Sequence, residues 1–349
     1  MRIVRHIRKL KGYVPGEQPR SANVIKLNTN ENPYPPSPEC AKAIARFDAT
    51  SLRRYPDPDC TALRAELAKM NHTSPERIFV GNGSDEILAL SAKCFVEDNE
   101  AIGSLDPSYS LYKTLAAIRN VKWVGVPAPA APLKVTPPIS LFLWTNPNAP
   151  TGEFAEPADI AKFAAKSKGV VIIDEAYADF AKTNCMSLAT AADNRNIIVM
   201  RTFSKSFSLA GLRVGYCVGP EDLIAALFKA KDSYNVDALA QAVALAAAKD
   251  RRWMKANVAK VKKTRKCFTR ELEKRGWDVI PSESNFVFAR PPKPLTAKKV
   301  FEGLKARKIF VRYFPGQLTG DRLRITIGTD EEMQALLAAL DRDSDVPIQ

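Results

Sequence analysis

One lysine stands where its surroundings favour chemistry. Lys205 lies in RTFSKSFSLAGLRVGY, among small and hydroxylated residues, directly after an expected strand and eight residues before Arg213. Partial desolvation in such a place lowers the pKa of a lysine and favours imine formation with a carbonyl compound. A solvated loop lysine is the plainer alternative. However, Thr202, Ser204 and Arg213 accompany Lys205 and together suit a phosphate, which arginine grips with paired hydrogen bonds. We therefore predict a reactive lysine beside a phosphate.

A carboxylate and a phenol follow a second expected strand. VVIIDEAY places Asp174 and Glu175 at the end of a buried run, with Tyr177 three residues after Asp174. Beyond a strand end, Asp174 and Tyr177 can present a carboxylate and a phenol to one side of a flat ligand. The run also resembles the magnesium-binding strand of an ATPase, but no GxxxxGK[ST] loop occurs to partner it. A purely structural role is the remaining alternative.

A glycine-rich turn supplies a further anion-binding element. IFVGNGSDEIL, from Ile78 to Leu88, is typical of a strand, a tight turn at Gly83, and a helix that begins near Ser84 and Asp85. Glycine lets backbone N–H groups approach an anion, and the helix N-terminus adds its dipole. Glu86 stands where a dinucleotide fingerprint would have its third glycine. We expect a phosphate here, with a plain tight turn as the alternative.

Composition excludes several other classes of protein. The two histidines, His6 and His72, lack acidic or cysteine neighbours, so we predict no metal site and no Ser/His/Asp triad. Six widely spaced cysteines without a CxxC pair favour reduced thiols. No apolar stretch approaches the roughly 20 residues of a membrane helix, and no signal-peptide pattern follows the basic N-terminus. We expect a cytoplasmic protein with no membrane partner.

Most of the net charge is concentrated in one segment. The chain has 52 basic and 38 acidic residues, which gives a formal charge of +14. The segment 249–275 contains twelve Lys/Arg and three acidic residues, a net +9, with apolar residues spaced as on one amphipathic helix. We interpret it as a helix with a solvated basic face. No recognition motif accompanies the charge, so we expect no nucleic-acid partner.

The elements that must position these residues form an α/β pattern. Apolar strands are expected near residues 78–80, 141–144, 170–173, 197–200 and 214–218, with helices between them. Continuous apolar strands separated by helices indicate a mostly parallel sheet with helices on both faces. Ligands bind at the carboxyl ends of such strands. We divide the chain into an N-terminal arm (1–30), a large domain (31–235) and a smaller α+β C-terminal domain (236–349).

The combined motifs resemble a known family, the fold-type I aminotransferases that depend on pyridoxal phosphate. Within it, the sequence is most similar to the histidinol-phosphate aminotransferases. The matching motifs run nearly end to end and in the family's order: YVPGEQP from Tyr13, LNTNENPYPPSP from Leu27, RYPDP from Arg54, GNGSDE from Gly81, NPNAPTG from Asn146, DEAY from Asp174, TFSKSFSLAGLRVGY from Thr202, DSYNV from Asp232, NFV from Asn285, and VRYFPG with LRITIGT toward the C-terminus.

The resemblance implies a role for each matching residue. Lys205 would bind the pyridoxal 5′-phosphate aldehyde as an imine, Asp174 would pair with the ring nitrogen, Tyr177 would contact the ring hydroxyl, and Tyr109 would stack on the ring. The cofactor phosphate would be bound by the turn and helix start at Gly83, Ser84 and Asp85, by Thr202, Ser204 and Arg213, and by Tyr55 of a neighbouring subunit. The family's asparagine before PTG is Ala149 here, and we expect Asn148 to substitute for it.

The resemblance also implies the reaction and its partners. Arg324 would bind the α-carboxylate of glutamate, and Arg312 with Tyr13 would help to hold the phosphate of histidinol phosphate. A surface salt bridge is the other interpretation of Arg312. The expected reaction is transamination between histidinol phosphate and 2-oxoglutarate in histidine biosynthesis, by a homodimer with shared active sites. Threonine-phosphate decarboxylase or an aromatic or other amino-acid aminotransferase of the same fold is the alternative. A nucleic-acid-binding regulator is a remote one.

Overall fold

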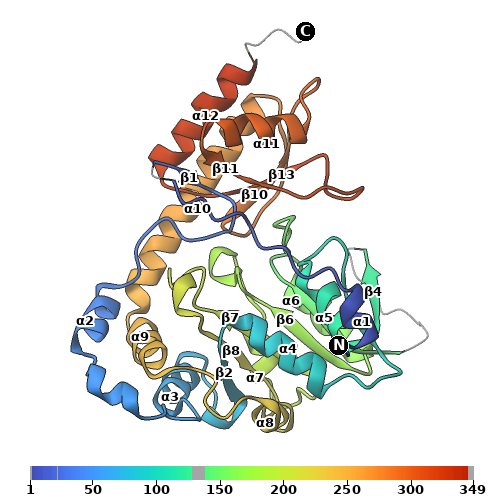
Figure 1. The fold of residues 1–349 in the computed structure, drawn as a ribbon, viewed down its shortest axis with the longest axis vertical. Coiled ribbons are helices and arrows are strands. Elements are labelled where there is room, and N and C mark those ends of the chain that lie inside the picture. Colours follow the sequence, from blue (N-terminus) through green and yellow to red (C-terminus); the bar gives the residue numbers. More distant parts are fainter. Residues whose placement is uncertain (1, 22, 128–137, 345–349) are drawn as a thin grey trace.

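The computed structural model describes residues 2–21, 23–127 and 138–344. Figure 1 shows two layered parts joined by the long helix α10, with the N-terminal segment running between them. The larger part surrounds a seven-stranded sheet in the order β2-β8-β7-β6-β5-β3-β4, in which β8 alone runs antiparallel to its neighbours. Its strands are β2 (Ile78–Gly81), β3 (Ala101–Leu105), β4 (Lys122–Val126), β5 (Ile139–Thr145), β6 (Val170–Asp174), β7 (Ile197–Thr202) and β8 (Gly215–Val218).

Helices cover both faces of this sheet because its central strands are apolar on both sides. On one face, Ile172 and Ile198 belong to a cluster with residues of α4, α5 and α8. On the other face, Val171 and Val199 pack with residues of α6 and α7. The helices of this part are α2 (Pro38–Arg46), α3 (Thr61–Met70), α4 (Ser84–Cys94), α5 (Leu111–Arg119), α6 (Pro157–Lys166), α7 (Met186–Thr190), α8 (Glu221–Ala230) and α9 (Ala238–Lys249). The expected α/β class is confirmed.

The smaller part is an antiparallel sheet covered by helices. Its four strands lie in the order β12-β13-β10-β9, and they are β9 (Asp278–Ile280), β10 (Phe286–Arg290), β12 (Arg312–Tyr313) and β13 (Leu323–Thr326). The helices are α10 (Arg251–Lys274), α11 (Ala297–Ala306) and α12 (Asp330–Ser344). This is the α+β arrangement that we predicted. As expected for an amphipathic helix, α10 buries a stripe that includes Val258, Val261 and Phe268.

The N-terminal arm is mostly irregular and ties the two parts together. Its regular elements are α1 (Arg5–Lys9) and the short strand β1 (Ile25–Lys26), which pairs in parallel with β11 (Ile309–Phe310) of the smaller part. After β1, the backbone of Leu27 accepts a hydrogen bond from Thr326 N on β13. The segment that follows β1 is thereby held against the smaller part.

One helix does not lie where our domain boundary places it. We assigned residues from 236 onward to the smaller domain, but α9 packs against α2 and α3 of the larger part. The buried alanine face of α9, which includes Ala240, Ala244 and Ala247, allows this close packing. The chain therefore passes to the smaller part along α10. Across the described ranges, no helix has the length and apolar composition required to cross a membrane.

Candidate active site

A cavity of about 860 Å³ lies where the large sheet, the arm and the smaller part meet. The cavity opens at the carboxyl ends of β6 and β7, the place where ligands bind in open α/β sheets. Twelve of the predicted site residues line it: Tyr13, Ser84, Asp85, Tyr109, Asp174, Tyr177, Thr202, Ser204, Lys205, Arg213, Arg312 and Arg324. Another cavity of about 620 Å³, between α10 and residues 178–184, is lined by different residues.

The turn before α4 forms one end of the cavity. Gly83 precedes the first helical residue, Ser84, and has a φ of 78°, a conformation that L side chains rarely adopt. A Cβ atom at Gly83 would lie 2.5 Å from Nη2 of Arg213. Glycine therefore lets the arginine lie directly over the helix N-terminus. Free amide groups and the helix dipole make this place attractive to an anion.

Hydroxyl groups and Arg213 complete this end of the cavity. Thr202 Oγ1 donates to Ser204 Oγ at 3.0 Å, and Nη1 of Arg213 reaches the same Oγ at 3.4 Å. Nη2 of Arg213 lies 3.5 Å from Asp85 Oδ2. These two contacts of Arg213 are long and therefore weak. A doubly charged anion, which binds a guanidinium more strongly than a hydroxyl group does, could replace them. The predicted phosphate-binding residues are brought together here.

Asp174 and Tyr177 come from the end of β6 and its following turn. The Asp174 carboxylate is buried and accepts hydrogen bonds from Tyr112 Oη at 2.7 Å and from Ala176 N at 3.1 Å. Burial raises the pKa of Asp174 to about 6 although both hydrogen bonds lower it. The phenol oxygen of Tyr177 accepts from Asn30 Nδ2 at 2.9 Å, which leaves the phenol proton free for a ligand.

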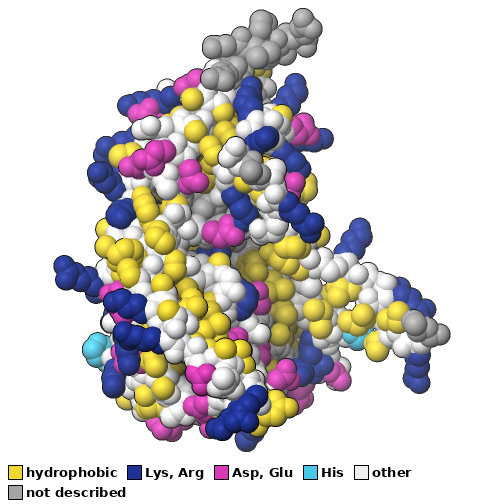
Figure 2. All heavy atoms as spheres, turned by 60° about the vertical axis from the view of Figure 1, so that its left-hand side comes forward, with side chains coloured by type: hydrophobic (Ala, Val, Ile, Leu, Met, Phe, Trp, Pro, Cys, Tyr) yellow, Lys and Arg dark blue, Asp and Glu magenta, His cyan; other side chains and the backbone are white. Residues whose placement is uncertain are grey.

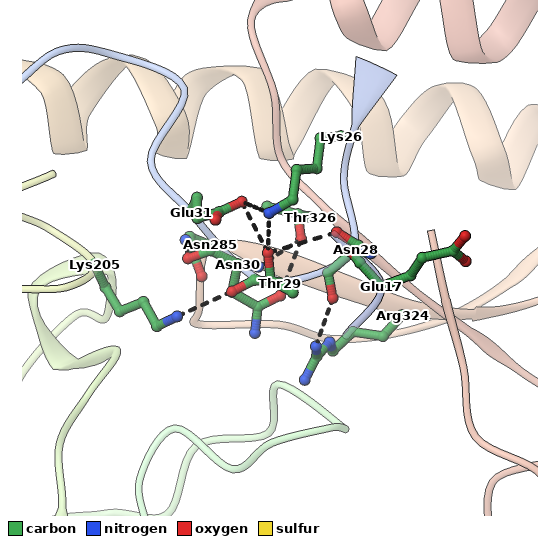
Figure 3. A network of polar contacts seen from close by, with 10 residues as sticks. All are labelled: Glu17, Lys26, Asn28, Thr29, Asn30, Glu31, Lys205, Asn285, Arg324 and Thr326. Atoms are coloured by element: carbon green, nitrogen blue, oxygen red, sulfur yellow. Dashed lines mark hydrogen bonds and ion pairs between the residues drawn. The ribbon is translucent and has the colours of Figure 1, made fainter. Parts of the chain in front are cut away.

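Lys205 points into the same space from the loop after β7. Its Nζ donates to the backbone carbonyl of Thr29 at 3.0 Å (Figure 3). The same Nζ lies 5.9 Å from the centre of the Tyr177 ring. Burial, followed by the positive charge of Arg324, lowers the pKa of Lys205 to about 8. A substantial fraction of this amine is therefore neutral, and so nucleophilic, near neutral pH. The amine thus lies in the cavity, at the position from which we predict imine formation.

A buried ion-pair network supports the Lys205 loop from behind. Arg201, on β7, donates to Glu175 Oε2 through Nε at 2.9 Å and through Nη2 at 2.7 Å. Nη1 of Arg201 reaches Asp179 at 3.1 Å, and Asp179 in turn accepts from Ser206 Oγ. The network links the end of β6 to the residue after Lys205. It therefore fixes the lysine relative to Asp174.

Two arginines close the opposite end of the cavity because of strand register. Arg312 of β12 pairs directly with Arg324 of β13, so both side chains leave the same face of the sheet. Nη2 of Arg324 donates to Asn28 O at 3.0 Å, whereas its buried Nε has no hydrogen-bond partner among the described residues (Figure 3). An unpaired buried donor is costly and is satisfied when an anion binds. The Arg324 site is therefore prepared for an anionic group.

The arm covers this anion-binding end. Arg312 donates through Nη2 to Val14 O at 3.0 Å and through Nη1 to Pro15 O at 3.2 Å. These bonds hold Tyr13 against the cavity, where its ring meets the edge of Tyr109 at a centroid distance of 5.8 Å. Within the ranges that the structure describes, Arg312 does not form the surface salt bridge that we considered as its alternative. It anchors the arm and lines the cavity.

Three predicted residues do not line the cavity: Gly83, whose turn precedes α4, Tyr55 and Asn148. Tyr55 has 80% of its surface exposed and stacks on Tyr234 with ring centroids 4.3 Å apart. Asn148 does not meet our expectation, because its amide is already bonded: Nδ2 donates to Pro107 O and Thr151 Oγ1, and Oδ1 accepts from Ser108 Oγ. Successive residues of this turn point in different directions, so Ala149, and not Asn148, lines the cavity.

Several important residues were not predicted. Tyr112 and Asn30 contact Asp174 and Tyr177, and Asn32 Nδ2 donates to the carbonyl of Lys205 at 3.2 Å. Tyr112 lies three residues after Tyr109, which puts both rings near one face at the start of α5. Asn30 and Asn32 belong to the motif LNTNENP, where only the structure shows that an irregular segment crosses the site.

The residues present fit pyridoxal phosphate. The cavity offers a partly neutral amine for the aldehyde, a buried carboxylate for the ring nitrogen, and a phenol for the ring hydroxyl. The amide, hydroxyl and guanidinium groups at the start of α4 suit the phosphate, and the turn there is one that a Cβ atom at Gly83 would fill. Each functional group of the cofactor thus finds a complementary group.

Comparison with known proteins agrees with this geometry. The model of the family "Aminotransferase class I and II" matches residues 22–340. A histidinol-phosphate aminotransferase of Geobacter sp. (strain M21) is 45% identical over 340 residues, covering 96% of each chain. The enzyme of that name from Syntrophotalea carbinolica is 44% identical over 344 residues, covering 96% of this chain and 97% of the relative.

A solved structure of a related protein has the same fold. The histidinol-phosphate aminotransferase from Sinorhizobium meliloti in complex with pyridoxal-5′-phosphate superposes with a TM-score of 0.87 at 25% identity, over 98% of this chain and 97% of that one. The family match extends over both parts of the fold and over the cavity between them. The chain belongs to the class I and II aminotransferases.

Proposed function

We propose that this chain is a pyridoxal-phosphate-dependent aminotransferase that transfers an amino group between histidinol phosphate and 2-oxoglutarate. The observation that carries the proposal is the pairing of Arg312 with Arg324 at one end of the cavity that contains Lys205. Two arginines provide more positive charge than one carboxylate requires, but they suit a phosphate. The names of relatives that are 44–45% identical over nearly the whole chain support the same substrate.

The residues of the cavity would divide the work as follows. When bound, the cofactor accepts electrons from the bond that breaks at the substrate Cα. Asp174, ionised at neutral pH, holds the proton on the ring nitrogen, and Tyr177 donates its phenol proton to the ring hydroxyl. Lys205, once free, has an amine that can take the proton from the substrate Cα and deliver it to the cofactor's C4′ carbon. Its pKa of about 8 suits both directions of that transfer.

One anion-binding pocket would serve both substrates. Histidinol phosphate has no carboxylate, so its phosphate would take the place that the α-carboxylate of glutamate occupies. Arg324 provides the shared contact, since its Nε has no partner among the described residues. Its guanidinium carbon lies 5.3 Å from the centre of the Phe286 ring and 5.1 Å from that of the Phe314 ring. Arg312 would meet the additional charge of the phosphate, with Tyr13 as a neutral donor from the arm. The reaction would thus be ping-pong, in two half-reactions at one site.

The proposed assembly is a homodimer with shared sites. Tyr55 lies outside the cavity of its own chain and is 80% exposed, and large apolar side chains nearby are exposed as well, with Ile44 at 54% and Leu52 at 60%. Figure 2, which brings the α2 side forward, shows hydrophobic side chains on this face. A second copy covering this face would bring Tyr55 to the partner's cofactor phosphate. A cytoplasmic location agrees with the six cysteines, all of which are free thiols.

Substrate half-reactions with arginine variants test this proposal. Arg312→Ala should lower kcat/KM for histidinol phosphate at least about tenfold, because a charged hydrogen bond is worth roughly 1.5 to 3 kcal/mol. The glutamate half-reaction should suffer less, since Arg324 remains. Arg324→Ala should impair both half-reactions. Arg290→Ala, an exposed arginine of β10, is the matched control and should change neither.

The substrate panel also separates the alternatives. Histidinol, which lacks the phosphate, should react far more slowly than histidinol phosphate. Preference for phenylalanine or tyrosine would identify an aromatic aminotransferase, and release of carbon dioxide from threonine phosphate would identify a decarboxylase. Either result contradicts the proposed substrate while the cofactor chemistry stands.

A further inference from the structure

A chain of hydroxyl groups lies behind Asp174 and plays no part in the function proposed above. Tyr112, on α5, is 1% exposed and does not line the cavity. Its Oη lies 2.7 Å from Asp174 Oδ2 and 2.6 Å from Oγ1 of Thr145, the last residue of β5. Because Thr145 pairs with Asp174 across neighbouring parallel strands, the three side chains are fixed by the sheet itself.

The direction of these hydrogen bonds follows from the number of protons available. An ionised carboxylate can only accept, so the Tyr112 hydroxyl donates its single proton to Asp174. At 2.6 Å from Thr145, the Tyr112 oxygen must then accept, and the Thr145 hydroxyl is its donor. Both protons therefore point toward Asp174. A donor that itself accepts a hydrogen bond is polarised and becomes a stronger donor.

Asn148, which we had assigned to the cofactor, fixes the residue at the far end of this row of hydroxyl groups. Ser108 Oγ lies 3.2 Å from Thr145 Oγ1 and donates to Asn148 Oδ1 at 2.9 Å. Asn148 Nδ2 donates to Pro107 O, which is an acceptor only, so the orientation of the amide is determined. The Ser108 proton goes to Asn148 and the Thr145 proton to Tyr112, so the contact between Ser108 and Thr145 carries no hydrogen bond. Asn148 therefore fixes the Ser108 side chain, which packs beside Thr145.

We propose that Tyr112 is a positioning residue which, polarised by Thr145, keeps the Asp174 carboxylate ionised and fixed in orientation. This inference rests on the proposed role of Asp174 as the partner of the cofactor ring nitrogen. Tyr112 does not line the cavity: its hydroxyl reaches the site through Asp174, and its ring packs edge-on against Tyr109 at a centroid distance of 5.5 Å, a contact that Tyr112→Phe keeps. Without it, one carboxylate oxygen would be buried with no hydrogen-bond partner among the described residues.

The electrostatic surroundings explain why Asp174 needs this support. Burial is the largest influence that raises its pKa, and the negative charges of Asp85 on α4 and Glu175 at the end of β6 add to it. The Tyr112 hydroxyl and the Ala176 amide act in the opposite direction. Tyr112 itself keeps its proton, because burial and the adjacent carboxylate raise its pKa well above the usual value. It therefore remains a donor over the whole working range of pH.

The test is the titration of the Asp174 carboxyl group in cofactor-free protein. Infrared difference spectra between ¹³C-aspartate-labelled wild type and Asp174→Asn isolate its signal as pH varies. Tyr112→Phe removes one hydroxyl and should raise the pKa of Asp174 by about one unit, a tenfold change in proton affinity. Tyr216→Phe is the matched control, since it removes a buried phenol from β8, two strands away from β6, and should leave the titration unchanged.

A second pair of variants tests whether Thr145 donates its hydrogen bond to Tyr112. Thr145→Val removes the polarising hydroxyl and should raise the pKa of Asp174 by less than Tyr112→Phe does. Thr145→Ser keeps a hydroxyl and should restore the wild-type titration. In the loaded enzyme, the acid limb of the kcat/KM profile should move to higher pH in the same order. This pair keeps the proposal testable if Tyr112→Phe does not fold.

Distinct results would overturn the two proposals. An unchanged Asp174 titration in Tyr112→Phe, or equal shifts in Tyr112→Phe and Tyr216→Phe, removes the positioning role. Identical behaviour of Thr145→Val and Thr145→Ser removes the polarising role of Thr145. Full activity of Asp174→Ala in the loaded enzyme would contradict the function proposed for Asp174 while leaving the apoprotein titration, and so the Tyr112 contact, intact.

Discussion

Replacing Lys205 with methionine in the cofactor-free protein should stabilise the fold, and the gain should depend on pH. Burial and the nearby Arg324 lower the pKa of the lysine from 10.5 to about 8 in the folded state. The unfolded chain therefore binds a proton more tightly than the folded one does. At 1.36 kcal/mol per pH unit, this difference costs the folded protein about 3 kcal/mol wherever the amine is charged in both states.

The sign of the pH dependence follows from the two pKa values. Below about pH 8 both states carry the proton, and the full cost of burying the charge is present. Between about pH 8 and 10.5 the folded lysine loses its proton while the unfolded lysine keeps it, so wild-type stability rises with pH. The stability gained by Lys205→Met should thus fall from about 3 kcal/mol at pH 7 to about 1 kcal/mol at pH 9.5.

Urea unfolding of the apoproteins at several pH values measures this advantage. The change between the two pH values is the diagnostic quantity, because differences in packing between lysine and methionine are the same at both. Lys69→Met is the control, because it makes the same substitution at a side chain that is 77% exposed. An advantage of Lys205→Met that is constant or grows with pH would refute the reasoning.

Two further predictions concern the support of the site and its assembly. Arg201→Met leaves the buried carboxylate of Glu175 and the partly exposed carboxylate of Asp179 without their cationic partner. It should cost about 3 to 5 kcal/mol of unfolding free energy in urea titrations, with loss of cofactor retention; a cost below about 1 kcal/mol would show that the network is dispensable. Tyr55→Phe should weaken binding of pyridoxal phosphate in equilibrium dialysis without changing the unfolding midpoint, and an active monomer in sedimentation at assay concentration would contradict the shared site.

From the sequence, the strands that bear site residues are easier to predict than the other strands of the sheet. The runs that end in Asp174 and Thr202 consist of large apolar residues and are recognisable as buried strands. We did not predict β3 and β4, because AIGSL and KWVGV contain Gly and Ser or an exposed Lys at positions where strands usually have β-branched residues. The structure explains the glycine in β3: a Cβ atom at Gly103 would lie 2.7 Å from the Phe142 ring.

Strand direction was also beyond the reach of the sequence. The apolar run at 214–218 is typical of a buried strand in either orientation, yet β8 runs against its neighbours. That reversal is important for the site, because the chain turns back after Lys205 and carries Arg213 to the start of α4. The motif alone places Arg213 eight residues after Lys205. Only the antiparallel return of the chain brings its guanidinium to the turn at Gly83.

Side-chain direction in irregular segments is the other part that sequence reasoning could not supply. Asn148 and Ala149 are neighbours in a proline-rich turn, and a shift of one residue decides which of them faces the cavity. Hydrogen bonds from Asn148 to both Pro107 and Thr151 determine that direction. Neither partner belongs to a pattern with a fixed spacing, so no periodicity argument could have placed the amide.

The segment after β1 shows how these parts become one site. Its backbone carbonyls accept hydrogen bonds from both ends of the cavity, at Asn28 from Arg324 and at Thr29 from Lys205 (Figure 3). Asn30 then bonds to Tyr177, so three consecutive residues contact the anion site, the reactive amine and the phenol. The Arg324 and Lys205 contacts therefore fall on consecutive carbonyl groups, and the backbone of this segment sets the distance between the two ends of the cavity.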